Sequence, residues 1–156
     1  MDYQVSLLRA IADQMRLAPV KTLALQPGVR AVFRLTVRYH DRRARDSVGT
    51  LRHLGRDEVK LEMVYRGLFE HKPLVIRIEP GRLEAFMLRL QQYRFDRLRD
   101  QPNLPAYGVD LWLVERAAGG FAWSVLLSPE RAQGVYAELA QSVRSLLPEA
   151  LRQVAA

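Results

Sequence analysis

Residues 31–40 alternate between apolar and mostly polar side chains, and this period of two constrains the fold more than any other feature of the chain. The apolar set is Ala31, Phe33, Leu35, Val37 and Tyr39, and the set between them is Val32, Arg34, Thr36, Arg38 and His40. Successive side chains of a β-strand point to opposite faces, so the alternation predicts a strand with one face on a core. The other face, which carries Arg34 and Arg38, is expected to point to water.

Shorter patterns predict the remaining elements. Three further strands are expected at Val48–Leu54, Val59–Arg66 and Leu74–Glu79. Apolar residues three and four apart predict three helices, over Asp2–Met15, from Pro80 to a point before Gln101, and from a Ser128 cap through Leu147. Residues 19–28 contain two prolines and a glycine and are expected to form a connector.

A hairpin is predicted late in the chain, from strands at Tyr107–Arg116 and Phe121–Leu127. A four-residue turn would place Arg116 opposite Phe121, which sets Trp112 and Trp123 on one face of the hairpin. The other face is also apolar, so both faces need a cover. Helices of the same chain are the favoured cover, and a second copy of the chain in a homodimer is the alternative.

The expected fold class is therefore α+β, with helices packed on a mostly antiparallel sheet. The predicted order is helix, four strands, helix, two strands, helix, and the short connections favour antiparallel neighbours. No repeat or linker divides the sequence, so residues 1–156 are expected to form a single domain.

Composition narrows the function classes. The chain has no cysteine, which excludes disulfides, thiolate metal sites and cysteine nucleophiles, and fits a reducing compartment. The bacterial cytoplasm is the expected location, because the first residues have no basic segment typical of a secretory leader. No apolar run approaches the roughly 20 residues that span a bilayer, so no membrane association is expected.

The net charge of +7 is concentrated near the first strand. Between residues 30 and 56 there are eight arginines and only two aspartates. The candidate binding residues on the outward strand face and the following loop are Arg34, Arg38, Arg42, Arg43 and Arg45. Such a surface could bind an acidic protein or a polyanion such as nucleic acid. Phe33 and Tyr39 alternate onto the opposite face, so the arginines lack the aromatic platform typical of single-strand binding.

No motif nominates a catalytic residue or a cofactor. The histidines His40, His53 and His71 lie at predicted strand ends, and a meander could bring them to one sheet edge as a metal or general-base site. Asp41 beside His40 would point to the opposite face, and no two histidines have helical ligand spacing. A metal-dependent enzyme is therefore the second alternative, and no metal ligand or cofactor is assigned.

The stretch from Ile78 to Leu151 resembles the emfourin-like protein inhibitors of thermolysin-type metallopeptidases and related bacterial proteins. The resemblance lies in a helix at Leu83–Leu90, an exit with Phe95 and Leu98, Asp110 opening a hairpin, and a closing helix. It implies a small sheet before the helix and a protein-binding role. The amino-terminal helix and the arginine-rich loop depart from this layout, and no inhibitory residue is carried over.

The order of elements also resembles the small dimeric chaperones of type III secretion, which are typically acidic, unlike this chain. Taken together, the sequence predicts a non-enzymatic domain that binds another protein through a sheet face or loop, with inhibitor-like binding as one form. Nucleic-acid or polyanion binding is the first alternative.

Overall fold

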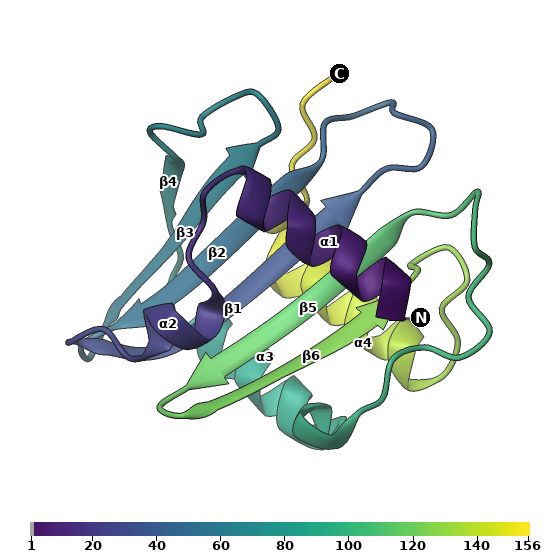
Figure 1. Cartoon of the computed structure of the whole chain (residues 1–156). Coiled ribbons are helices and arrows are strands. Elements are labelled where there is room, and N and C mark those ends of the chain that lie inside the picture. Colours follow the sequence, from purple (N-terminus) through teal and green to yellow (C-terminus); the bar gives the residue numbers. More distant parts are fainter. Residues whose placement is uncertain (1) are drawn as a thin grey trace.

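The sheet of this protein has six strands in the order β4-β3-β2-β1-β5-β6, and every neighbouring pair is antiparallel (Figure 1). The computed structural model describes residues 2–156. The strands are β1 (Val29–Arg38), β2 (Ser47–Leu54), β3 (Glu58–Tyr65), β4 (Leu74–Arg77), β5 (Leu111–Ala118) and β6 (Phe121–Leu127). The helices are α1 (Asp2–Gln14), α2 (Val20–Ala24), α3 (Pro80–Gln92) and α4 (Val135–Leu146), with short 3-10 turns η1 (Phe95–Arg97) and η2 (Pro148–Leu151).

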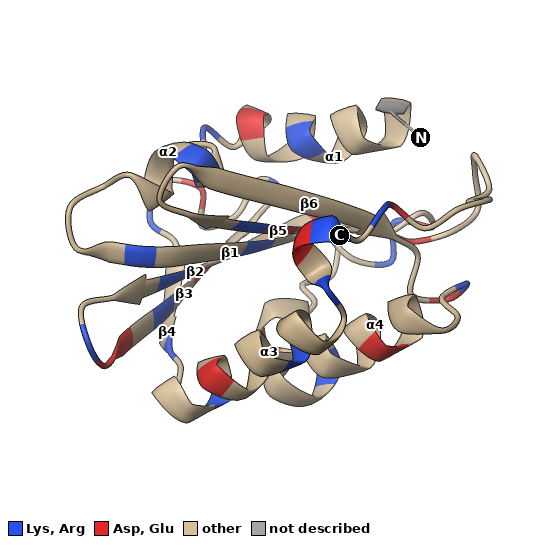
Figure 2. Cartoon of the chain, turned by 90° about the horizontal axis from the view of Figure 1, so that it is seen from below, with Lys and Arg blue, Asp and Glu red and all other residues tan. Residues whose placement is uncertain are grey.

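Helices cover both faces of the sheet, which gives three layers (Figure 2). On one face, α3 and α4 pack on the apolar side of β1, and Phe86 meets Phe33 edge-on with ring centroids 5.7 Å apart. On the other face, α1 contributes Leu8 and Ile11 to a second cluster with β5, while α2 packs against Val32. None of the helices described, from residue 2 onward, is long and apolar enough to cross a membrane.

The α+β class, the antiparallel sheet and the succession of the six strands along the chain are confirmed. One element was missed, because residues 19–28 contain helix α2 rather than only a connector. The helix has five residues, which is too short for a periodic pattern, and its Val20, Leu23 and Ala24 are buried.

The last helix begins later than predicted. It starts at Val135 after Gly134, and not at Ser128. Ser128 is buried and its backbone N–H donates to the Gln101 side chain at 2.9 Å, so this residue is held at the end of β6 instead of capping a helix.

The hairpin of β5 and β6 has a two-residue turn, Gly119-Gly120, and Arg116 faces Trp123 rather than Phe121. Gly119 has a φ of 54°, as a tight hairpin turn of this length requires. The predicted register was therefore wrong by two residues. A shift by two preserves the faces of a strand, so Trp112 and Trp123 do lie on one face as predicted. Trp112 is buried by its own chain, whereas Trp123 is 37% exposed.

The expectation that Arg34 points to water was wrong. Helix α1 covers that face of β1, and Arg34 is only 3% exposed. Its Nε donates to Thr50 Oγ1 at 2.9 Å, and Glu115 lies opposite it on β5. Burial lowers the pKa of Arg34, and the charge of Glu115 opposes this shift. Burial likewise raises the pKa of Glu115, and Arg34 opposes that change.

Replacing Arg34 with Met should lower the free energy of unfolding by about 3 kcal/mol, because Glu115 then lacks its neighbouring buried cation. Adding Glu115→Gln should recover part of the loss, which urea denaturation of both single variants and the double variant will measure as a coupling. Thr50→Val is the control and should cost about 1 kcal/mol. Additive single effects would show that Arg34 and Glu115 do not interact.

Candidate functional site

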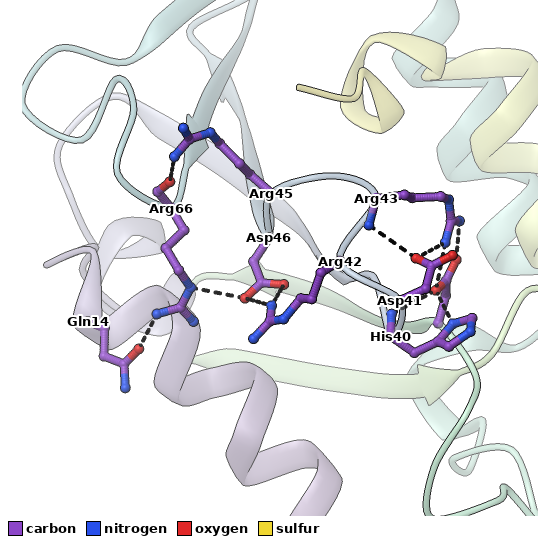
Figure 3. A network of polar contacts seen from close by, with 9 residues as sticks. Gln14, His40, Asp41, Arg42, Arg43, Arg45, Asp46 and Arg66 are labelled. Carbon is purple, nitrogen blue, oxygen red and sulfur yellow. Dashed lines mark hydrogen bonds and ion pairs between the residues drawn. The ribbon is translucent and has the colours of Figure 1, made fainter. Parts of the chain in front are cut away.

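The arginine-rich loop between β1 and β2 is held by two carboxylates, Asp110 and Asp46. Figure 3 shows Asp46 with Arg42 and Arg66. Both carboxylates are almost completely buried, with exposures of 4% and 1%. A buried carboxylate needs paired charge or hydrogen bonds to be tolerated. The loop arginines supply this charge, so their partners decide what remains available to a ligand.

Asp110 accepts contacts from two residues of the loop. The backbone N–H of His40 donates to Asp110 Oδ1 at 3.0 Å, and the His40 Nδ1 atom lies 2.8 Å from the same oxygen. The Arg43 guanidinium donates to both Asp110 oxygens and also to Asp41 at 2.7 Å, and it lies over the Tyr39 ring. Burial alone would raise the pKa of Asp110, but the bonds from Arg43 and His40 outweigh it and hold the pKa below its usual value.

Asp46 is the second centre of the loop. Arg42 Nη1 donates to both Asp46 oxygens at 3.1 and 3.2 Å, and Arg66 Nε donates at 3.0 Å. Arg66 also reaches Gln14 of α1 at 2.7 Å (Figure 3). Arg45 donates to the backbone carbonyls of Arg66 and Ala155. The three loop arginines are therefore engaged within the chain.

The predicted basic surface does not form. Arg34 is buried and Arg38 is half-buried at the end of β1. The remaining arginines of residues 30–56 divide between the two ends of the β1–β2 hairpin: Arg42, Arg43 and Arg45 lie in its loop, and Arg30, Arg52 and Arg56 lie at the other end. The alternation of β1 could not reveal this, because it does not show which face a distant helix covers.

The histidines do not gather either. His53 pairs with Ala31 at the opposite end of the sheet from His40, and His71 lies in the β3–β4 loop. Within residues 2–156 one group has metal-ligand composition, formed by His40, Asp110 and Glu130, whose ligand atoms lie within 4.8 Å of one another. Glu130 Oε1 accepts the Asp110 backbone N–H at 2.7 Å. A metal ion here would have to displace Arg43 from Asp110, so the arrangement favours an ion pair over a metal centre.

Replacing Asp110 with Asn should lower the free energy of unfolding by about 2 kcal/mol at pH 7, because the hydrogen bonds from Arg43 and the His40 backbone lose their charged acceptor. The folded-state pKa of Asp110 is depressed, so its contribution is full above the unfolded pKa of about 3.9 and is lost as pH falls through the lower folded value. Urea unfolding at several pH values should therefore show the difference between wild type and variant closing in acid.

The control for this variant is Asp41→Asn, since Asp41 binds the same arginine from an exposed position. Solvent screens an ion pair between exposed side chains, so this change should have little effect. A gap between wild type and Asp110→Asn that stays constant down to pH 2 would contradict the assigned role of Asp110.

The open edge of strand β6 is the second candidate surface. The backbone N–H and carbonyl of Leu126 point away from β5. The N–H donates to Asp100 Oδ1 at 2.7 Å, and the carbonyl accepts the Gln101 N–H at 2.8 Å. Strand geometry repeats every two residues, so Ala122 and Ser124 also direct their N–H and carbonyl groups outward. In the part of the chain that the structure describes, no backbone group is bonded to these two residues on that side.

Exposed aromatic rings lie along this open edge. Phe121 is 42% exposed and Trp123 is 37% exposed, and the indole N–H of Trp123 donates to the Leu98 carbonyl at 2.9 Å. A cavity of about 680 Å³ adjoins the edge on the α1 side and includes Trp123, Ser124 and Glu115 in its wall. A smaller cavity of about 350 Å³ lies on the α3 side of the sheet, between the end of α3 and Arg116, the β5 residue that pairs with Trp123. We define the open edge as residues 121–124 with these two cavities.

Five arginines line the two cavities. Arg9 donates to Ser124 Oγ at 3.0 Å and Arg116 pairs with Asp96. The other three have side chains that make no hydrogen bond or ion pair within residues 2–156: Arg94, Arg97 and Arg99. The sequence places Asp96 and Asp100 among them and suggested ion pairs. Instead, Asp96 binds Arg116 at 3.0 Å, and Asp100 accepts the Leu126 N–H. Sequence reasoning missed this surface, because strand order alone decides that β6 lies at an edge.

The open edge predicts a particular pattern of hydrogen exchange. The backbone amides of Ala122 and Ser124 should exchange at least ~100-fold faster than those of Trp123 and Val125, whose N–H groups face β5. Two-dimensional NMR of the chain in deuterated buffer measures all four amides together. Protection of Ala122 and Ser124 in a dilute monomer would show that the edge is covered.

Comparison of the chain with protein-family models, curated proteins and solved structures found no match. The assignment of function therefore depends on the geometry of the two surfaces described above.

Proposed function

We propose that this chain is a non-enzymatic protein-binding domain, and that it binds an extended segment of another protein as an added strand along the open edge of β6. The observation that carries the proposal is the unpaired backbone of Ala122 and Ser124 beside two exposed aromatic rings. Added strands obtain affinity from backbone hydrogen bonds and specificity from pockets for alternate side chains. The larger cavity, lined by Ala122, Trp123 and Ser124, supplies one such pocket, and the smaller cavity lies beside Arg116, the β5 partner of Trp123.

The rest of the sheet supports this choice of surface. Both faces carry helices, so the sheet face expected from the sequence is not available at β1 or β5. The other edge strand, β4, has four residues and lies between Pro73 and Pro80. Short edges with proline are typical of strands protected from pairing. The resemblance to emfourin-like inhibitors is in keeping with protein binding, but the resemblance itself stays a prediction. The cytoplasmic location also stays a prediction.

Polyanion binding loses its main support. Its predicted residues Arg42, Arg43 and Arg45 bind carboxylates or carbonyls of the chain itself, and Arg34 is buried. A ligand at the loop would have to compete with the bonds that hold the loop in place.

The proposal is tested by Ala122→Pro. Proline removes the outward N–H of residue 122 and leaves the β5–β6 ladder intact, since edge strands accept proline at such positions. Random twelve-residue peptides are first selected on the immobilised wild-type chain, and their affinities are then measured for each variant. We expect a loss of about tenfold or more, because the peptide carbonyl is left without its donor.

The matched control is Val75→Pro on β4, where the Ile78 N–H bonds to β3, so that the Val75 N–H points outward on the other edge. This variant should keep wild-type affinity. Ser124→Pro provides a second test if Ala122→Pro does not fold. The proposal is wrong if neither Ala122→Pro nor Ser124→Pro lowers the affinity of any selected peptide. It is also wrong if ultracentrifugation shows that a second copy of the chain occupies this edge.

A further inference from the structure

From the three unpaired arginines beside the open edge, we infer that the segment bound there is acidic. This inference rests on the proposed strand addition and adds the chemistry of the partner. Arg94 and Arg97 line the cavity on the α3 side, and Arg99 lines the cavity on the α1 side. An added strand alternates its side chains between these two sides, so carboxylates on either side would meet a guanidinium group.

The charges around the edge support an acidic partner. The exposed side chains of Arg94, Arg97 and Arg99 make no ion pair within residues 2–156. The neighbouring carboxylates are already engaged, since Asp96 pairs with Arg116 and Asp100 accepts the Leu126 N–H. Because Asp96 and Asp100 have other partners, the side chains of Arg94, Arg97 and Arg99 are free to bind a ligand.

This surface differs from the arginine-rich loop in the partners of its charges. In the loop, Arg42 and Arg43 neutralise the buried carboxylates Asp46 and Asp110. At the edge, the side chains of Arg94, Arg97 and Arg99 have no structural carboxylate to neutralise within residues 2–156. Unpaired arginines beside unpaired strand backbone are what an acidic extended segment would need.

The open edge is short, so the charges of Arg94, Arg97 and Arg99 matter more for the affinity of an added strand. Outside the closed position at Leu126, only Ala122 and Ser124 offer outward backbone groups on β6. At most four backbone hydrogen bonds can form with a partner, which gives weak binding by itself. Charge attraction speeds the encounter and selects the partner, and it weakens as salt rises.

The inference is tested with three synthetic eight-residue peptides that share a Val-Thr-Val-Thr centre. Their two outer residues on each side are Asp-Glu, Gln-Gln or Lys-Lys. Fluorescence anisotropy in 50 mM NaCl measures binding to the full chain. The acidic peptide should bind about tenfold more tightly than the glutamine peptide, the lysine peptide should bind least, and the advantage should shrink in 500 mM NaCl.

The triple variant Arg94→Gln, Arg97→Gln and Arg99→Gln should remove the advantage of the acidic peptide. A matched triple variant changes three exposed cations on the β2–β4 side of the sheet, Arg56→Gln, Lys72→Gln and Arg77→Gln, and alters net charge by the same amount. This control should keep the advantage, since it leaves the edge unchanged. Equal effects of the two triple variants would mean that only net charge matters, and would overturn the inference.

The variant Ala122→Pro separates failure of the inference from failure of the proposed function. If all three peptides bind equally and lose affinity with Ala122→Pro, strand addition holds and the acidic preference is wrong. If none depends on residue 122, both proposals fail. A single-stranded thymidine octamer is included as a probe. Tighter binding of this octamer than of the acidic peptide would assign the arginines to a polyanion and overturn the inference.

Discussion

The burial of strand β1 on both faces and along both edges is the constraint on which the rest of the structure depends. Its apolar face lies on α3 and α4, its other face lies under α1 and α2, and it pairs with β2 and β5. A strand in this position has no solvent face. Arg34 must therefore be accommodated inside the protein, beside Thr50 and Glu115, at a cost in desolvation.

Charge serves two different purposes in this chain. In the β1–β2 loop, Arg42 and Arg43 hold buried carboxylates, which ties the loop to the β5 side and to the strand ends. Beside β6, Arg94, Arg97 and Arg99 hold nothing in the described chain. The highest density of arginines in the sequence lies at the loop, but the loop arginines have partners within the chain, whereas Arg94, Arg97 and Arg99 have none within residues 2–156.

Sequence reasoning succeeded where the signal was local and periodic. The alternation in β1 and the i, i+3 stripe of α1 depend on backbone geometry that repeats along the chain, and these two elements formed close to their expected ranges. Helix α3 begins at Pro80 as predicted, but it ends at Gln92, short of the predicted end before Gln101, and Phe95–Arg97 form a separate 3-10 turn. Sequence reasoning failed where a choice depended on residues far away. The start of α4 was misplaced because the distant residue Gln101 binds Ser128. The predicted register of the hairpin was wrong for a local reason, because the turn has two residues instead of four.

The sequence by itself determined the α+β class, the succession of strands along the chain and the absence of disulfides, since these follow from local pattern and residue type. Only the tertiary structure decided which faces and edges meet water. The order β4-β3-β2-β1-β5-β6 puts the arginine-bearing β1 in the middle and β6 at an edge. Strand order is set by the joint burial of side chains far apart in the chain, so no local pattern contains it.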